Sequence, residues 1–63
     1  MDYNVGDEIT YALWGGGLRT GIVTEKHGDV KNGQPGFDMV CADGDTYWGY
    51  DDQIVAVAVR GRI

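Results

Sequence analysis

The chain has 63 residues, a formal net charge of −5 at pH 7 and 11% aromatic residues. This length suits one domain near the lower limit for folding alone, and the aromatic content argues against intrinsic disorder. The acidic balance argues against a nucleic-acid partner, because affinity for phosphate backbones comes largely from basic groups. The longest apolar run, residues 54–59, is too short for a membrane span, and the opening residues lack a signal-peptide pattern. A single cysteine allows no internal disulfide, so we expect a soluble cytoplasmic protein.

The first half of the chain predicts two strands joined by a glycine loop. Residues 8–13 alternate polar with apolar side chains, which is the pattern of a half-buried strand. The glycines at 15–17 interrupt this strand, and we expect Trp14 to fold over the open end of the domain. A second strand is predicted at 18–27, with a bend near Gly21.

The second half of the chain predicts three further strands separated by turn signals. Residues 27–36 are polar and contain the turn pair Asn32-Gly33, so they predict an exposed hairpin loop. Asp43-Gly44 predicts a tight hairpin, because both residue types tolerate the backbone angles that it requires. The remaining predicted elements are a third strand at 37–42, a fourth at 46–50, a short 3₁₀ turn at 51–53 and a fifth strand at 54–59.

Five short strands without a predicted α-helix indicate an all-β fold, and we predict a five-stranded barrel formed by a single domain over residues 1–63. The barrel is expected to span about residues 5–59. The apolar positions of the strands supply the predicted core, which consists of Val5, Ile9, Tyr11, Ile22, Val23, Phe37, Met39, Cys41, Trp48, Ile54 and Val57.

The order of these elements resembles the SH3-like small β-barrel superfamily. The resemblance rests on residues 5–7 (Val-Gly-Asp), a strand, a glycine loop and residues 21–23 (Gly-Ile-Val), an opening similar to that of KOW and Tudor-type barrels. It covers about residues 5–57 and implies an SH3-like barrel architecture rather than an activity. The short, acidic, glycine-rich chain also resembles small barrel proteins encoded by bacteriophages of actinobacteria.

Familiar catalytic and ligand-binding motifs are absent at the spacing that their chemistry requires. A P-loop begun at Gly16 would place Ile22 where the phosphate-binding lysine belongs. A calcium loop begun at Asp43 would place Ile54 where a bidentate glutamate belongs. His27 is the single histidine, the chain has no serine, and we predict no cluster of metal ligands. The sequence therefore predicts a protein that is not an enzyme and holds no cofactor or metal.

Aromatic and acidic residues near the predicted loops suggest a surface for a protein partner. SH3 and Tudor relatives bind proline-rich peptides or methylated side chains with loop aromatics, and the acidic balance would favour a cationic ligand. The alternative is that these rings fill the small core. The first hypothesis makes the chain a non-catalytic protein–protein interaction module or modulator. Its predicted partner-binding residues are Trp14, Tyr47, Tyr50, Asp51 and Asp52.

Two other functions remain open from the sequence. One is a nucleic-acid-associated barrel of the KOW kind, in which Arg19, Lys26 and Lys31 would form a local basic stripe. The other is a self-assembling structural subunit, because residues 54–63 continue an alternating apolar strand past the point where a five-stranded barrel closes. We expect a homodimer or higher oligomer from this strand, unless its terminal arginines blunt it and leave a monomer.

Overall fold

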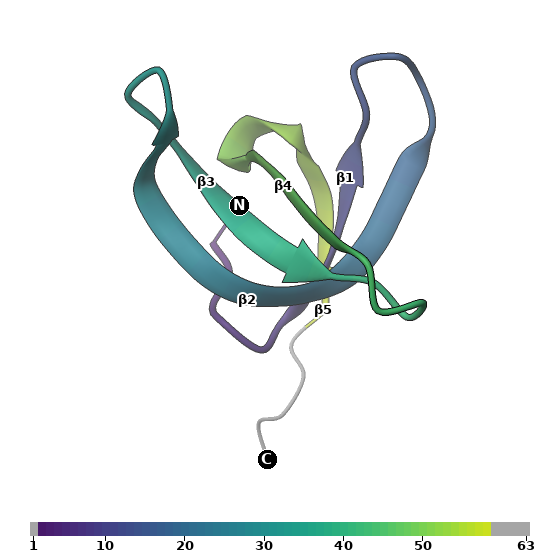
Figure 1. Cartoon of the computed structure of the whole chain (residues 1–63). Helices are drawn as coiled ribbons and strands as arrows, with labels where there is room; N and C mark the ends of the chain where they lie inside the picture. The colour runs from purple at the N-terminus through teal and green to yellow at the C-terminus, as the bar shows by residue number, and fades with distance from the viewer. Residues whose placement is uncertain (1, 59–63) are drawn as a thin grey trace.

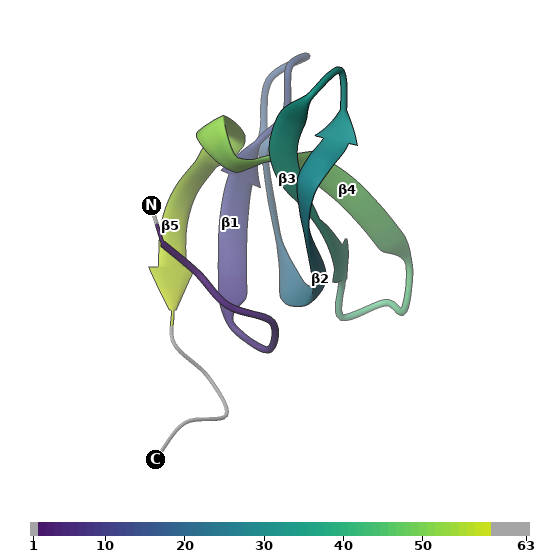
Figure 2. The same ribbon diagram turned by 90° about the vertical axis from the view of Figure 1, so that its left-hand side faces the viewer.

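The computed structural model describes residues 2–58, which form one antiparallel sheet of five strands, so the all-β prediction is confirmed. The strands lie in the order β4-β3-β2-β1-β5, and the last strand therefore pairs with the first. Figure 1 shows β2 crossing the sheet in one long curve, and Figure 2 shows β5 beside β1 with the single-turn helix at their end. The elements are β1 (Glu8–Ala12), β2 (Leu18–Lys31), β3 (Gln34–Val40), β4 (Thr46–Tyr50), η1 (Asp51–Gln53) and β5 (Ile54–Ala58).

The β2–β3 hairpin is longer than predicted, and the exposed loop expected at 27–36 is wrong. β2 continues to Lys31 and β3 begins at Gln34, so a two-residue turn joins them. Asn32 and Gly33 have φ values of 56° and 73°, the positive angles that make Asn-Gly the preferred hairpin turn. The sequence indicated a loop here because most residues of the arm are exposed, and strands of that kind lose the alternation of polar and apolar residues.

Phe37 lies at the centre of the core and has no exposed surface. The rings of Tyr3 and Tyr11 meet it edge-on, with centroids 5.9 and 5.3 Å away. The buried hydrophobic cluster consists of Tyr3, Ile9, Tyr11, Val23, Phe37, Met39 and Ile54. Six of these seven positions were predicted from alternation, and Tyr3 was missed because it precedes the first strand.

Trp48 was predicted in the core and is instead 44% exposed. The inner face of β4 is crowded at the next position, Gly49. A Cβ atom there would lie 2.8 Å from Phe37 Cζ and 3.1 Å from Tyr11 Cε2, so the space opposite these rings admits only a glycine. Because side chains alternate along a strand, Tyr47 shares the inner face with Gly49, and Trp48 points outward.

Val5 was also predicted in the core, and it is 57% exposed at the corner of a turn. In this turn the backbone N–H of Asp7 donates to the carbonyl of Asn4 at 3.0 Å. The Asp7 side chain is buried, and one of its carboxylate oxygens accepts the Asn4 N–H at 2.9 Å. Gly6 and Asp7 exchange backbone hydrogen bonds with Val23, so the turn docks on β2 through polar groups rather than through Val5.

The remaining predicted core positions are intermediate in burial. Ile22 is half-buried, and Cys41 and Val57 pack against the edge of the buried cluster. The predicted bounds of the fourth strand and of the 3₁₀ turn agree with β4 and η1. β5 ends at Ala58, and the predicted continuation through 59–63 lies outside the described residues. None of the helical structure in residues 2–58 has the length and apolar character needed to cross a bilayer.

Candidate functional site

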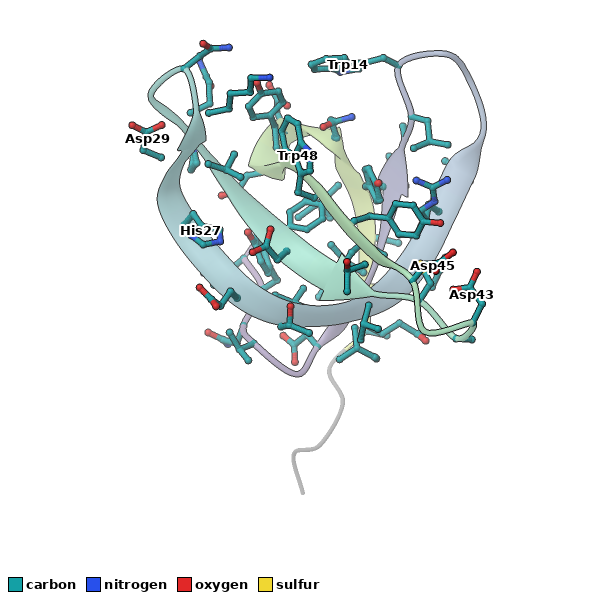
Figure 3. The ribbon with its side chains drawn as sticks, in the orientation of Figure 1. Trp14, His27, Asp29, Asp43, Asp45 and Trp48 are labelled. Carbon is teal, nitrogen blue, oxygen red and sulfur yellow. The ribbon has the colours of Figure 1, made fainter. Side chains whose placement is uncertain are left out.

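Three aromatic side chains form a row at one end of the sheet. Trp14 is 78% exposed in the β1–β2 loop and stacks on Tyr50, with ring centroids 5.5 Å apart and planes 28° apart. Trp48 on β4 meets the same Tyr50 ring edge-on, with ring centroids 5.5 Å apart. Figure 3 shows Trp14 reaching from its loop over the same end of the molecule that Trp48 occupies. Tyr50, of which 9% is exposed, therefore supports both tryptophans.

The β1–β2 loop holds Trp14 in place with backbone hydrogen bonds. Leu13 N–H donates to the carbonyl of Gly17, and Gly16 N–H donates to the carbonyl of Leu13, both at 3.0 Å. Gly16 and Gly17 have φ values of 97° and 90°, which other residues rarely adopt, so the glycine run gives this loop its tight path.

A groove of about 340 Å³ lies between this loop and β4. Its volume falls at the lower end of the range typical of small-molecule and side-chain pockets. Gln53 also lines the groove, and two hydrogen bonds fix its side chain: its Nε2 donates to the carbonyl of Ala12 at 2.9 Å and its Oε1 accepts the Tyr50 N–H at 2.9 Å. The residues that form the groove include Tyr11, Leu13, Trp14, Arg19, Tyr47 and Trp48.

Among the described residues that line the groove, Arg19 is the one that carries a charge. Its guanidinium carbon lies 3.7 Å from the centre of the Tyr47 ring, and Nη1 donates to the Tyr11 hydroxyl at 3.5 Å. The hydrogen bond to Tyr11 raises the pKa of Arg19 above its ordinary value. One face of the Tyr47 ring is therefore already covered by a cation of the protein itself. The sequence did not predict this contact, and it favoured a cationic ligand at the aromatic residues.

The five predicted partner-binding residues lie in three settings. Trp14 and Tyr47 line the groove, and Tyr50 supports it from below. Asp51 and Asp52 lie in η1 and are not among the residues lining the groove. The carboxylate of Asp51 accepts a hydrogen bond from the Tyr3 hydroxyl, whereas the Asp52 side chain is exposed.

The groove also contains residues that were not predicted to bind a protein partner, including Leu13, Arg19 and Trp48, and Trp48 was predicted in the core. Tyr47 and Trp48 are adjacent aromatic residues of opposite alternation, so either could have faced inward. The available signal was Gly49, which marks the inner face as too crowded for a side chain. If Gly49 is assigned to the inner face of the strand, alternation places Trp48 on the outer face.

The basic residues of β2 each face a different aromatic ring. Arg19 covers Tyr47, as described above, and Lys26 Nζ lies 4.5 Å from the centre of the Tyr3 ring. Lys31 Nζ lies 5.6 Å from the centre of the Trp48 ring. These are cation–π contacts, so each of the three basic groups already interacts with an aromatic ring of the same chain.

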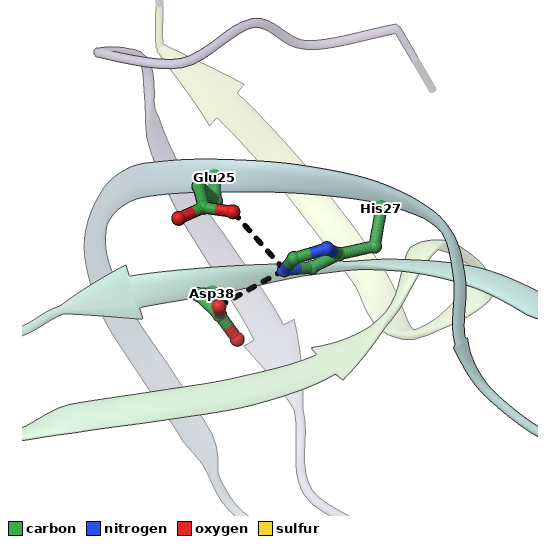
Figure 4. Close-up of side chains that lie close together, drawn as sticks. All are labelled: Glu25, His27 and Asp38. Atoms are coloured by element: carbon green, nitrogen blue, oxygen red, sulfur yellow. Dashed lines mark hydrogen bonds and ion pairs between the residues drawn. The ribbon is translucent and has the colours of Figure 1, made fainter.

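A separate polar cluster lies on the outer face of the β2–β3 hairpin (Figure 4). His27 Nε2 is 2.9 Å from Asp38 Oδ2 and 3.8 Å from Glu25 Oε2. The hydrogen bond to Asp38 raises the pKa of His27, and the nearby Glu25 charge acts in the same direction. No such grouping was predicted from the sequence, because it depends on the pairing of two strands. Cys41, the single free thiol, is not part of it.

The chain matches no protein-family model, and no curated protein or solved structure is significantly similar to it. The groove and the polar cluster are therefore interpreted from their own geometry.

Proposed function

We propose that this protein is a non-catalytic protein-interaction module, an SH3-like barrel that binds an extended peptide segment of another protein in the groove beside Trp14 and Trp48. The observation that carries the proposal is the exposure of both tryptophans at the rim of one groove while Tyr50 holds each in place. Large aromatic residues that are exposed but rigid are typical anchors of binding energy at protein interfaces.

The topology supports the SH3-like assignment. The first four strands pair in sequence order, the fifth pairs with the first rather than with the fourth, and a 3₁₀ turn immediately precedes it. This is the order expected for an SH3-like barrel. In that architecture the β1–β2 loop and the face of β4 would bound a peptide groove, which is where the exposed tryptophans lie.

The proposed ligand contains proline or another bulky apolar residue next to a basic residue. Flat aromatic walls suit proline, and an extended proline-rich segment loses little conformational entropy on binding. The basic flank follows from the net charge of −5 and from Asp45, whose Oδ2 accepts the Tyr47 hydroxyl at 3.4 Å beside the groove. Figure 3 shows Asp43 and Asp45 together at the turn between β3 and β4.

Within residues 2–58, the arrangement of the lysine and arginine side chains favours a protein partner over a nucleic acid. Arg19, Lys26 and Lys31 face separate aromatic rings rather than one shared surface. With a single unpaired thiol, the proposed setting is the reducing interior of a cell.

Intrinsic fluorescence tests the proposal directly, because both tryptophans of the chain line the groove. Titration with proline-rich peptides that carry flanking arginine or lysine should change the emission and saturate. Trp14→Ala is expected to weaken binding at least about tenfold, since truncating an aromatic hot-spot residue typically removes about 2 kcal/mol or more. The loss for Trp48→Ala should be similar, measured by calorimetry because one fluorophore is then missing.

Leu18→Ala is the matched control. Leu18 is 65% exposed at the start of β2 and does not line the groove, so its truncation should leave affinity unchanged. If Leu18→Ala weakens peptide binding as much as Trp14→Ala does, that result would argue against binding in the groove. Saturable binding that both tryptophan variants retain would place the partner elsewhere on the protein and refute the proposal.

A further inference from the structure

The pairing of β2 with β3 brings one histidine and two carboxylates together. Glu25 pairs directly with Asp38 across the two strands, and His27 lies two residues beyond Glu25 on β2. Val23 and Glu25 would share a face in a regular strand, yet Val23 is buried and Glu25 is exposed. A register shift between these residues turns Glu25 outward, which is the effect of a β-bulge.

The three potential ligand atoms converge on a small volume, as Figure 4 shows. His27 Nε2, one oxygen of Glu25 and one oxygen of Asp38 all lie within 4.8 Å of one another. Tetrahedral ligands at typical zinc bond lengths lie about 3.3 Å apart. The observed separations from Nε2, 2.9 Å to Asp38 and 3.8 Å to Glu25, lie on either side of that value.

Electrostatics also favours a cation at this point. Two carboxylates that face each other across paired strands repel, and a bound dication would offset that repulsion. An imidazole nitrogen with carboxylate oxygens suits zinc better than magnesium or calcium, which prefer oxygen ligands alone. We propose that Glu25, His27 and Asp38 form a zinc-binding site that joins β2 to β3.

The site has room for additional ligands. His27 and Asp38 also line a surface cavity of about 560 Å³, together with Asp29, Val30, Lys31 and Trp48. The side chains of His27 and Asp38 are 32% and 44% exposed, so water can complete the coordination of an ion held there. Three protein ligands with open positions are the arrangement of an accessible zinc site rather than of a closed structural one.

Titration of the full chain with zinc chloride, in buffer free of chelator and phosphate, tests the site without any peptide ligand. One zinc ion should bind per chain by calorimetry, and the imidazole signals of the single histidine should shift in NMR spectra. His27→Gln, Glu25→Gln and Asp38→Asn should each weaken binding at least about tenfold. Zinc should also raise the Tm of the wild type by several degrees and leave that of His27→Gln unchanged.

Two variants control for charge and for the thiol. Asp52→Asn removes the same charge as Asp38→Asn from an exposed carboxylate outside the cluster, and it should bind zinc as the wild type does. Cys41→Ala should also bind as the wild type does. The proposal is overturned if the wild type binds no zinc at millimolar concentration, if His27→Gln retains wild-type affinity, or if Cys41→Ala abolishes binding. Equal affinity for magnesium would refute the assignment to zinc.

Discussion

Tyr3 connects the N-terminal segment to two distant parts of the chain. Its hydroxyl hydrogen bond is shared between the carbonyl of Gly36 in β3, at 3.1 Å, and the carboxylate of Asp51 in η1. Lys26 lies over the ring, and its Nζ donates to the Tyr3 carbonyl at 2.8 Å. Because Tyr3 is buried, these polar contacts replace the water that its hydroxyl loses on folding.

We predict that Tyr3 makes the fold sensitive to alkaline pH. Burial, reinforced by Asp51, raises the pKa of Tyr3 above the ordinary value of 10.0. The unfolded chain therefore ionises first, so stability is fully present below pH 10.0 and is lost as the pH rises above it. Urea unfolding from about pH 8 to about pH 11 should show this decline.

Tyr3→Phe separates the contribution of the hydroxyl's hydrogen bonds from the effect of its ionisation. At neutral pH the variant should lose about 1–2 kcal/mol, because the polar partners of the hydroxyl stay partly buried. Above pH 10.0 its stability should fall less steeply than that of the wild type. Some slope should remain, because burial also raises the pKa of Tyr47. An unchanged alkaline slope in Tyr3→Phe would contradict the role of Tyr3.

At the scale of the elements, β2 is the central strand of the sheet and is long enough to pair with two neighbours. It pairs with β1 through its first half and with β3 through its second. Gly21 lies against the backbone of β3. A Cβ atom there would lie 2.6 Å from the carbonyl oxygen of Val40 and 2.3 Å from Met39 Cε. The methionine end is flexible, whereas the backbone of β3 is not.

Gly21→Ala is therefore expected to destabilise the protein by about 2 kcal/mol, the typical penalty for forcing an extra methyl group into a packed region. Thermal unfolding followed by circular dichroism measures the loss. Gly28→Ala is the control in the same strand, because a Cβ atom at Gly28 would meet nothing within 4 Å and its φ is not positive. Similar losses in both variants would show that strand propensity, not the approach of β3, decides the effect.

At the scale of the whole molecule, the strand order places β4 and β5 at its two ends. β5 pairs with β1 and carries Val55, which is 48% exposed. Exposed apolar residues on such strands favour pairing with another chain, and charged residues on them oppose it. A domain this small also buries little surface by itself, so association would add to its stability.

The self-association expected from the sequence stays a prediction, and Val55 offers a test of it. Light scattering at high micromolar concentration should give a mass above that of one chain for the wild type. Val55→Lys should shift the mass toward the monomer, because a lysine there would repel its counterpart in the neighbouring chain. Leu18→Lys, at a similarly exposed apolar position on β2, should leave the mass unchanged. A monomeric wild type would refute the prediction.

Short-range sequence patterns alone predict much of the fold. Alternation identified β1, and the aromatic run followed by two aspartates identified β4 and η1 with their observed bounds. These elements could be predicted because their signals lie within a few consecutive residues. The β2–β3 arm could not be bounded in this way, because most of its residues are exposed and its sequence lacks a regular alternation of polar and apolar residues.

The tertiary structure alone decided which side chains form the candidate sites. Crowding by Phe37 and Tyr11 at Gly49 turned Trp48 outward to the groove. The register shift in β2 turned Glu25 toward Asp38. Both outcomes depend on contacts between strands that are distant in sequence, and a shift of one residue reverses the face on which a side chain lies. The sequence by itself determined most of the strands and turns outside the β2–β3 arm, and packing between strands determined the surfaces that they present.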